Sequence, residues 1–545
     1  MRPIMVDTTP PNTMGSPEAE PQRAPQVCSH CKSIKKGCDK KLPSCSQCIK
    51  RRAVCRYREP SEPRRYGDEL VNAVPTMDTS NAASTWTSIP KSVLGRLNPS
   101  MRVSILLMNS MSDIIQSSVG QPSTSQSTST DDIFHSQVFH IIRADGHYVE
   151  DVVTRYFNGV HLWAPIISKK RFYDRYRFPQ SAPTADLSVL ILVMRLITQF
   201  PSPDKEVDQD REILYLATKT LFTQVQTFIP ASLPLVQASI LLSRYEQAHG
   251  MIDAAYITCG TSARMAYALD IQDAQYSAEP PGSDNWFDEE EQLATWWGLV
   301  ICDISIACDN RMVERPFAIR RIRQNDYLPL ESDQLAGEAP SLDARHRYFV
   351  SATSLTNVGT FGRECQATFV HAKVRMAAQE DNFTHDKLTS LGRELQGLLS
   401  MVMQQTEGRW DHYAGAMKTL IVGMYTLHWA ALKSEDIRSR SNATESIRVT
   451  LNTVTRMVID IAYAFNAERS DGNSEVLAPT IGHIVRCTQQ HISTCNDFGN
   501  EKWRRDFEEL RTMLRFFARR WLLASRELHE LNKTAEAAAV GARQN

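Results

Sequence analysis

Six cysteines between positions 28 and 55 follow the spacing C-x2-C-x6-C-x6-C-x2-C-x6-C, the strongest constraint on the fold of this chain. A structural zinc ion takes four thiolate or imidazole ligands. Two zinc ions need eight coordination positions, and six sulfurs fill them if two sulfurs bridge both metals. The spacing therefore predicts a cluster of two Zn2+ ions held by six thiolates, those of Cys28, Cys31, Cys38, Cys45, Cys48 and Cys55.

The two halves of this segment repeat the same C-x2-C-x6-C pattern. Two residues between the first cysteines let both thiolates reach one metal, and the next six residues suffice for a short helix before the third ligand. Each half is therefore expected to form a helix followed by an extended strand. Because Cys28 and Cys45 occupy equivalent positions in the two halves, we predict that they are the bridging pair.

Disulfide bonds are the alternative use of so many cysteines, and they are typical of small secreted scaffolds. The first 22 residues lack the apolar core of a signal peptide, and the chain is too long to need disulfide stabilisation. We therefore expect metal-binding thiolates. The remaining cysteines lack ligand spacing and are predicted to be free buried thiols. They are Cys259, Cys302, Cys308, Cys365, Cys487 and Cys495.

The cysteine segment is also strongly basic. Positions 23–58 contain eleven Lys and Arg residues against one acid, Asp39, which gives a formal charge of +10. Because the whole chain carries −1, all other residues together carry −11. A charge of this sign and density suits a polyanion such as nucleic acid.

The stretch VCSHCKSIKKGCDKKLPSCSQCIKRRAVCRY resembles the DNA-binding module of the fungal Zn2Cys6 (binuclear zinc cluster) transcription factors, in its spacing, in Asp39 and in Pro43. The resemblance implies that the module binds double-stranded DNA, with its first helix in the major groove of a CGG-like half-site. Lys35 matches the family's base-contacting lysine, and lysine can donate to guanine O6 and N7. The residues expected to contact DNA are Lys32, Lys35, Lys36, Lys50, Arg51 and Arg52.

Two positions depart from the family pattern. Ile34 and Gly37 stand where family members usually carry basic residues, which implies fewer phosphate contacts. Gly37 has two interpretations: it ends the first helix in a left-handed conformation, or it lets the backbone approach DNA. These departures leave an alternative function open, a zinc-containing protein-interaction or ligand-sensing scaffold with weak or nonspecific DNA binding.

Shifts in composition divide the chain into five predicted segments. The fold class expected from them is mostly α, with a small zinc module and a large all-helical regulatory domain. The segments are a disordered N-terminus (1–26), the Zn2Cys6 module (27–58), a largely disordered linker with one helix near 100–116 (59–131), a helical domain (132–335) and a C-terminal helical extension (336–545).

The linker contains the positions where a dimerisation coiled coil and a nuclear-import signal are expected in such a chain. Family members often form homodimers through a coiled coil after the zinc module, but Pro90 and Pro99 interrupt this region and no heptad pattern lasts three heptads. Homodimerisation by another route stays open. Arg64 and Arg65 lie downstream of the basic run 50–52 and are expected to complete a nuclear-import signal.

From about residue 132 the apolar residues recur with a helical period. One predicted helix carries its apolar face on Leu235, Ala238, Leu241, Leu242, Tyr245 and Ala248, and Gly250 ends it. A second helix follows at once, with Tyr256, Gly260, Ala263 and Ala266 expected to allow close packing, so the two are predicted to pair antiparallel.

This region resembles the fungal-specific transcription factor domain, which is all helical in the family. The resemblance rests on the stretch from Tyr156, on the helix pair and on the stretch from Glu289, with Glu314 as a departure. It implies a regulatory role, with a small-molecule effector or a coregulator as a further partner.

Two other functional classes are not expected. The apolar runs 187–200 and 293–308 are shorter than ~20 residues and contain Arg195 and Asp303, so they predict buried helices and no membrane segment. The chain has no GxGxxG, P-loop, GxSxG or HExxH motif, so we do not expect an enzyme or catalytic residues. Trp163, Trp296 and Trp297 are predicted to be core residues.

The sequence thus predicts a nuclear, sequence-specific DNA-binding regulator of RNA polymerase II transcription. Its zinc cluster would contact CGG-like half-sites, and its helical domain would regulate or dimerise. The family resemblance also implies target genes in a metabolic or secondary-metabolite gene cluster.

Overall fold

The computed structural model divides the chain into two compact units, residues 1–82 and 83–545, which are considered one at a time. Residues 1–26 and most of 59–131, where disorder is predicted, lie outside the described residues. The structure describes residues 27–28, 30–31, 36–51, 55, 101–108, 129–176, 183–200, 206–273, 283–312, 314–331, 347–406, 412–440, 442–468, 478–479, 481–494 and 501–544.

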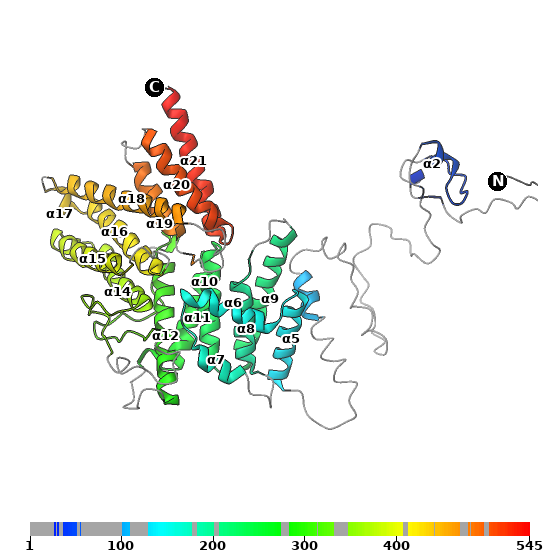
Figure 1. Ribbon diagram of the computed structural model, residues 1–545, viewed down its shortest axis with the longest axis horizontal. Helices are drawn as coiled ribbons and strands as arrows, with labels where there is room; N and C mark the ends of the chain where they lie inside the picture. The colour runs from blue at the N-terminus through cyan, green and yellow to red at the C-terminus, as the bar shows by residue number, and fades with distance from the viewer. Residues whose placement is uncertain are drawn as a thin grey trace, which may run out of the picture. The chain divides into compact units, whose positions relative to one another are not determined.

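The larger unit is built from helices (Figure 1). Its described residues contain no β-strand, although Tyr327 and Phe349 form an isolated antiparallel bridge. The predicted fold class is therefore confirmed. The helices are α5 (Thr130–Ala144), α6 (Val149–Asn158), η1 (Val160–Leu162), α7 (Lys169–Tyr176), α8 (Ala185–Ile197), α9 (Glu206–Phe228), α10 (Leu233–Ala248), α11 (Ile252–Ala268), η2 (Ile271–Asp273), α12 (Asp284–Ile306), η3 (Asn310–Met312), α14 (Thr360–Ala378), α15 (His385–Thr406), α16 (Ala414–Lys433), α17 (Glu435–Arg438), α18 (Ala443–Glu468), α19 (Ile481–Thr494), α20 (Glu501–Ala518) and α21 (Leu522–Gln544).

Local sequence signals define both ends of α10. The Ser232 side chain accepts a backbone N–H of the first turn at 3.4 Å, as an N-cap residue does. Gly250 follows the last turn with φ +77°, the left-handed conformation that glycine adopts at helix ends. The whole predicted apolar face is buried, but Gln237 and Glu246 on other faces are buried too. The helix is therefore an interior one rather than an amphipathic surface helix.

Helices α10 and α11 pack against each other as the predicted pair. Ala263 and Ala266 are buried, and the Ser243 hydroxyl donates to the carbonyl oxygen of Ala255 at 2.8 Å, which small side chains on both helices permit. The expectation for Gly260 is wrong. A Cβ built there would meet no atom within 4 Å, so Gly260 faces open space rather than the helix contact.

The two apolar runs form α8 and α12, as predicted, and their charged residues are satisfied internally. Arg195 forms an ion pair with Asp145. The Asp303 carboxylate accepts the backbone N–H groups of Ala318 at 2.8 Å and Ile319 at 3.0 Å, while burial raises its pKa to about 6. Among the helices that the structure describes, none is both long and apolar enough to cross a membrane.

The tryptophans chosen from the sequence lie in or against the core. Trp296 and Trp297 are buried, and the Trp297 indole N–H donates to the carbonyl oxygen of Tyr327 at 2.8 Å. Trp163 is half-buried and packs edge-on against Trp521, with ring centroids 6.4 Å apart. The Trp297 indole, buried with its N–H satisfied, is a structural residue, as predicted.

One hydrophobic core runs through the larger unit, from Val103 in the helical stretch 101–108 to Leu531 in α21. It crosses the predicted boundary at residue 335, because α12 packs on α14 and α10 packs on α21 (Figure 1). An ion network also joins the two sides of residue 335, because Arg486 pairs with Asp309 at 3.0 Å and with Glu527 at 2.8 Å. The C-terminal extension is therefore packed into the same core.

Candidate metal centre and nucleic-acid interface

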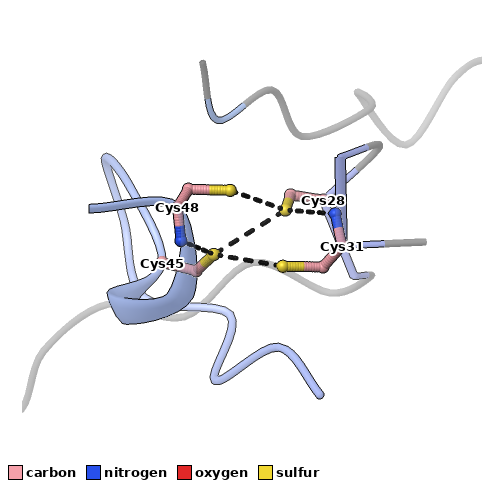
Figure 2. Close-up of side chains that lie close together, drawn as sticks. All are labelled: Cys28, Cys31, Cys45 and Cys48. Atoms are coloured by element: carbon pink, nitrogen blue, oxygen red, sulfur yellow. Dashed lines mark hydrogen bonds between the residues drawn. The ribbon is translucent and has the colours of Figure 1, made fainter. Parts of the chain in front are cut away.

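Four cysteines of the smaller unit converge on one point (Figure 2). The Sγ atoms of Cys28, Cys31, Cys45 and Cys48 all lie within 4.8 Å of one another, and all four residues are buried. Cys28 Sγ lies 3.7 Å from Cys45 Sγ and 3.6 Å from Cys48 Sγ, and Cys31 Sγ lies 3.6 Å from Cys45 Sγ. Sulfurs placed tetrahedrally at the usual Zn–S bond length of ~2.3 Å are ~3.8 Å apart. The separations therefore fit shared zinc coordination.

Cys38 and Cys55 lie at the edge of this cluster, and both are half-buried. Cys38 Sγ is 3.9 Å from Cys28 Sγ, and Cys55 Sγ accepts the backbone N–H of Cys45 at 3.3 Å. All six predicted ligands thus lie in one cysteine cluster. Cys28 is close to sulfurs of both halves, as a bridging ligand must be, and the Cys28–Cys45 bridge stays a prediction.

The backbone repeats the same arrangement in both halves. The N–H of Cys31 donates to Cys28 Sγ at 3.4 Å, and the N–H of Cys48 donates to Cys45 Sγ at 3.4 Å. In the second half the bond caps helix α2 (Ser46–Lys50), so the sulfur takes the place of an N-cap oxygen. The strand predicted after each helix does not appear among the described residues.

Burial and hydrogen bonds act in opposite directions on the thiols of the cluster. Hydrogen bonds from Cys48 lower the pKa of Cys45, whereas burial raises the pKa of Cys31 to about 12 and raises the pKa of Cys28 as well. Thiols with raised pKa values keep their protons at neutral pH unless a cation displaces them, which is how zinc binding becomes coupled to folding. Six soft sulfur donors suit zinc, and sharing them between two ions leaves no open coordination position. The centre therefore has the chemistry of a structural zinc site.

A contact between the two halves was not foreseen from the sequence. Asp39 Oδ1 accepts the backbone N–H of Ser46 at 3.0 Å, and Asp39 Oδ2 accepts the Ser46 hydroxyl at 2.5 Å. The hydroxyl bond is the main reason that the pKa of Asp39 is lowered. A carboxylate at the start of α2 also satisfies a free N–H of that helix. Asp39 was noted only as a family signature, and a serine directly after Cys45 was the available clue.

The predicted DNA-contacting residues are only partly described. Lys36, Lys50 and Arg51 are exposed, the last two at the C-terminal end of α2. The Lys36 N–H donates to the carbonyl oxygen of Cys31 at 3.1 Å, which keeps this lysine beside the cluster. The other three, Lys32, Lys35 and Arg52, lie outside the described residues, as does Ile34.

One interpretation of Gly37 is wrong. It does not adopt a positive φ, whereas Lys40 does, with φ 57°. Gly37 is exposed, and a Cβ built on it would meet nothing within 4 Å. The position therefore has room for a larger side chain, and glycine is not required there by the backbone.

The other cysteines behave as free thiols where they are described. Cys259, Cys302 and Cys365 are buried, and Cys308 and Cys487 are half-buried. Cys495 lies outside the described residues.

Comparison with known proteins agrees with both units. Residues 26–64 match the family described as "Fungal Zn(2)-Cys(6) binuclear cluster domain". Residues 153–333 match the family described as "Fungal specific transcription factor domain".

Two curated relatives are similar to parts of the chain. "Transcription factor BOA15" of Botryotinia fuckeliana is 29% identical over 144 residues, which cover 26% of this chain and 79% of that protein. "Asperfuranone cluster transcription factor afoA" of Emericella nidulans is 28% identical over 220 residues, which cover 35% of this chain and 29% of that protein.

The cysteine geometry, the helical unit and these matches agree with one another. A binuclear Zn2Cys6 domain binds two zinc ions, and its thiolates are present here in one cluster. The chain is a transcription regulator with a Zn2Cys6 binuclear cluster domain and a fungal-specific transcription factor domain.

Proposed function

We propose that this regulator binds double-stranded DNA through its zinc module and recognises CGG-like half-sites in the major groove. The observation that carries the proposal is the exposure of Lys36, Lys50 and Arg51 around a closed cysteine cluster. A rigid centre that presents exposed cations suits phosphate contact, and lysine near guanine gives base specificity. In this proposal Lys35 and Lys36 contact bases, and Lys32, Lys50, Arg51 and Arg52 contact phosphates.

The zinc ions in this proposal have a structural task. They neutralise the thiolates and hold the two halves together, and the six sulfurs leave no site for substrate or water. The protein's own residues do the recognition: the cluster orients the cations, and Asp39 joins the halves through Ser46. We propose a non-enzymatic regulator of RNA polymerase II transcription that acts in the nucleus.

The regulated genes are proposed from one relative. The Emericella nidulans protein is named for the asperfuranone cluster, so we propose a secondary-metabolite gene cluster as the target of this chain too. The helical domain would regulate the zinc module, respond to an effector or coregulator, or form a homodimer.

Selection from a random duplex library tests the DNA proposal. The zinc-loaded full chain is incubated with the library at ~150 mM salt, where nonspecific phosphate contacts are weakened, and the bound pool is sequenced. We expect enrichment of CGG-like triplets, singly for a monomer and in pairs for a dimer. Absence of enrichment with two zinc ions bound would favour the scaffold alternative.

The Lys35→Ala variant separates base contact from phosphate contact. If Lys35 contacts guanine, the variant loses ~1–3 kcal/mol on the selected site and discriminates less against mutated triplets. Lys41→Ala is the matched control, an exposed lysine of the same module that is not assigned to bases. A uniform loss on all sequences would make Lys35 a phosphate contact.

A further inference from the structure

A small cavity in the helical unit is lined by residues of α12, α14 and α16. Its volume is about 10 Å³, which is room for about one water-sized particle. Polar groups from all three helices line it beside apolar ones. The lining residues are Ile301, Ile304, Ser305, Cys308, Thr368, His371, Lys418, Thr419 and Val422.

A buried ammonium group faces this cavity. Lys418 is 8% exposed, and its Nζ donates to Ser305 Oγ at 2.8 Å. Within the described part of the chain, no carboxylate oxygen lies within 4.0 Å of that Nζ, so two of its three donors are left for another acceptor. A buried cation normally has a counter-ion. Burial lowers the pKa of Lys418, so an anion beside its Nζ would favour the charged form.

The neighbouring polar groups also offer protons rather than acceptors. Ser305 Oγ already accepts bonds from Lys418 and from Gln247 Nε2, the latter at 3.1 Å, so its own proton must point to a further acceptor. His371 is 1% exposed, and neither ring nitrogen has a partner. Burial lowers its pKa to about 3, so the neutral ring supplies one more N–H donor.

The nearest acids do not supply the missing charge. Asp309 is already engaged by Arg486, with 3.0 Å between Oδ2 and the guanidinium. Glu364 forms no ion pair with Lys418, and burial raises its pKa, which favours its uncharged form. The cavity is therefore rich in donors and positive in charge.

We propose that this cavity is a binding site for one monoatomic monovalent anion of the size of chloride, held by Lys418, Ser305 and His371. The cavity volume sets the size, since formate, sulfate or a larger anion would require the three helices to separate. The site would stabilise the regulatory domain in proportion to anion occupancy. It is independent of the proposed DNA contacts, so either proposal can fail without the other.

Thermal unfolding of the zinc-loaded full chain tests the site. Wild type and Lys418→Met are heated at one fixed rate in sodium chloride, sodium formate or sodium sulfate at equal ionic strength. We expect the midpoint difference between wild type and Lys418→Met to be larger by about 2 °C or more in ~200 mM chloride than in formate or sulfate, because the general stabilisation by sulfate acts on both proteins alike. Lys433→Met is the matched control, because it removes an exposed lysine from the same helix. It should respond as the wild type does.

Two outcomes would overturn the proposal. Parallel midpoints for wild type and Lys418→Met in all three salts would mean that the cavity holds water. A Lys418→Met protein that is more stable in every salt would mean that the lysine is buried without a ligand. If Lys418→Met fails to fold, Ser305→Ala gives the same comparison with a smaller change, and retention of its full chloride response would contradict the site.

Discussion

The zinc module and the helical domain are stabilised in opposite ways. The described core of the module consists of cysteines alone. The helical domain has one continuous core of aliphatic and aromatic side chains, shared by helices from both sides of residue 335. A segment too small to bury much apolar surface depends on metal ligation, which can supply ~10–16 kcal/mol, whereas the domain depends on burial. The two stabilities should therefore be separable.

The Cys28→Ala substitution is the strongest test of whether the module and the helical domain are stabilised independently. It removes the predicted bridging sulfur from both metals, so we expect loss of both zinc ions and of most of the ~10–16 kcal/mol that they supply. The helical circular dichroism signal should persist. Zinc per chain and ellipticity at 222 nm are the measurements.

Cys365→Ala is the control for this experiment. Cys365 is buried in α14 of the helical domain and is not a predicted ligand, so its variant should keep two zinc ions. Two zinc ions per chain in Cys28→Ala would contradict the bridged cluster.

A change in the helical domain should have the converse effect. Arg486→Ala leaves Asp309 and Glu527 without their shared partner, and breaking a buried pair costs about 3–5 kcal/mol. We expect a lower denaturant midpoint with zinc content unchanged. Arg515→Ala, which breaks an exposed pair with Glu508, should cost less than about 1 kcal/mol. Equal losses in the two variants would refute a single core that spans residue 335.

The Asp39→Ala substitution tests how much the contact between the two halves of the module contributes to zinc binding. Without the carboxylate, the two halves lose their contact through Ser46, and we expect zinc affinity to fall by at most about tenfold, the scale of a lost helix cap. Competition with a chromogenic chelator measures it. Ser46→Ala should show part of the same loss, and the double variant should lose no more than Asp39→Ala. Additive losses would mean that the two residues act separately.

The smallest expected effect concerns charge on the module surface. Gly37 has open space around it, so Gly37→Arg should fit without distortion and add a phosphate contact. We expect a few-fold gain in affinity for all DNA sequences, and a salt dependence steeper by ~0.9 in log–log slope. Gly260→Arg, in the open space beside α11, should leave DNA binding unchanged. An unchanged slope for Gly37→Arg would place that position away from phosphate.

Prediction from the sequence succeeded where a short pattern carries its own chemistry. The cysteine spacing predicted a cluster, Gly250 predicted the C-terminal end of α10, and two apolar runs predicted buried helices. It failed where one residue type serves several environments. Gly260 was expected at a helix contact and faces open space, and Gly37 was offered as a left-handed residue that it is not.

The sequence by itself determined the metal and the helical class and predicted the ligand set, because ligand spacing and apolar periodicity are local properties of the chain. Only the tertiary structure decided which distant groups meet. The Arg486 network across residue 335 and the donor-rich cavity around Lys418 join residues that are far apart in sequence, and the Asp39–Ser46 contact joins the two halves of the module. Hydrogen bonds and charge balance depend on distances of a few ångströms, and packing of the whole core sets those distances.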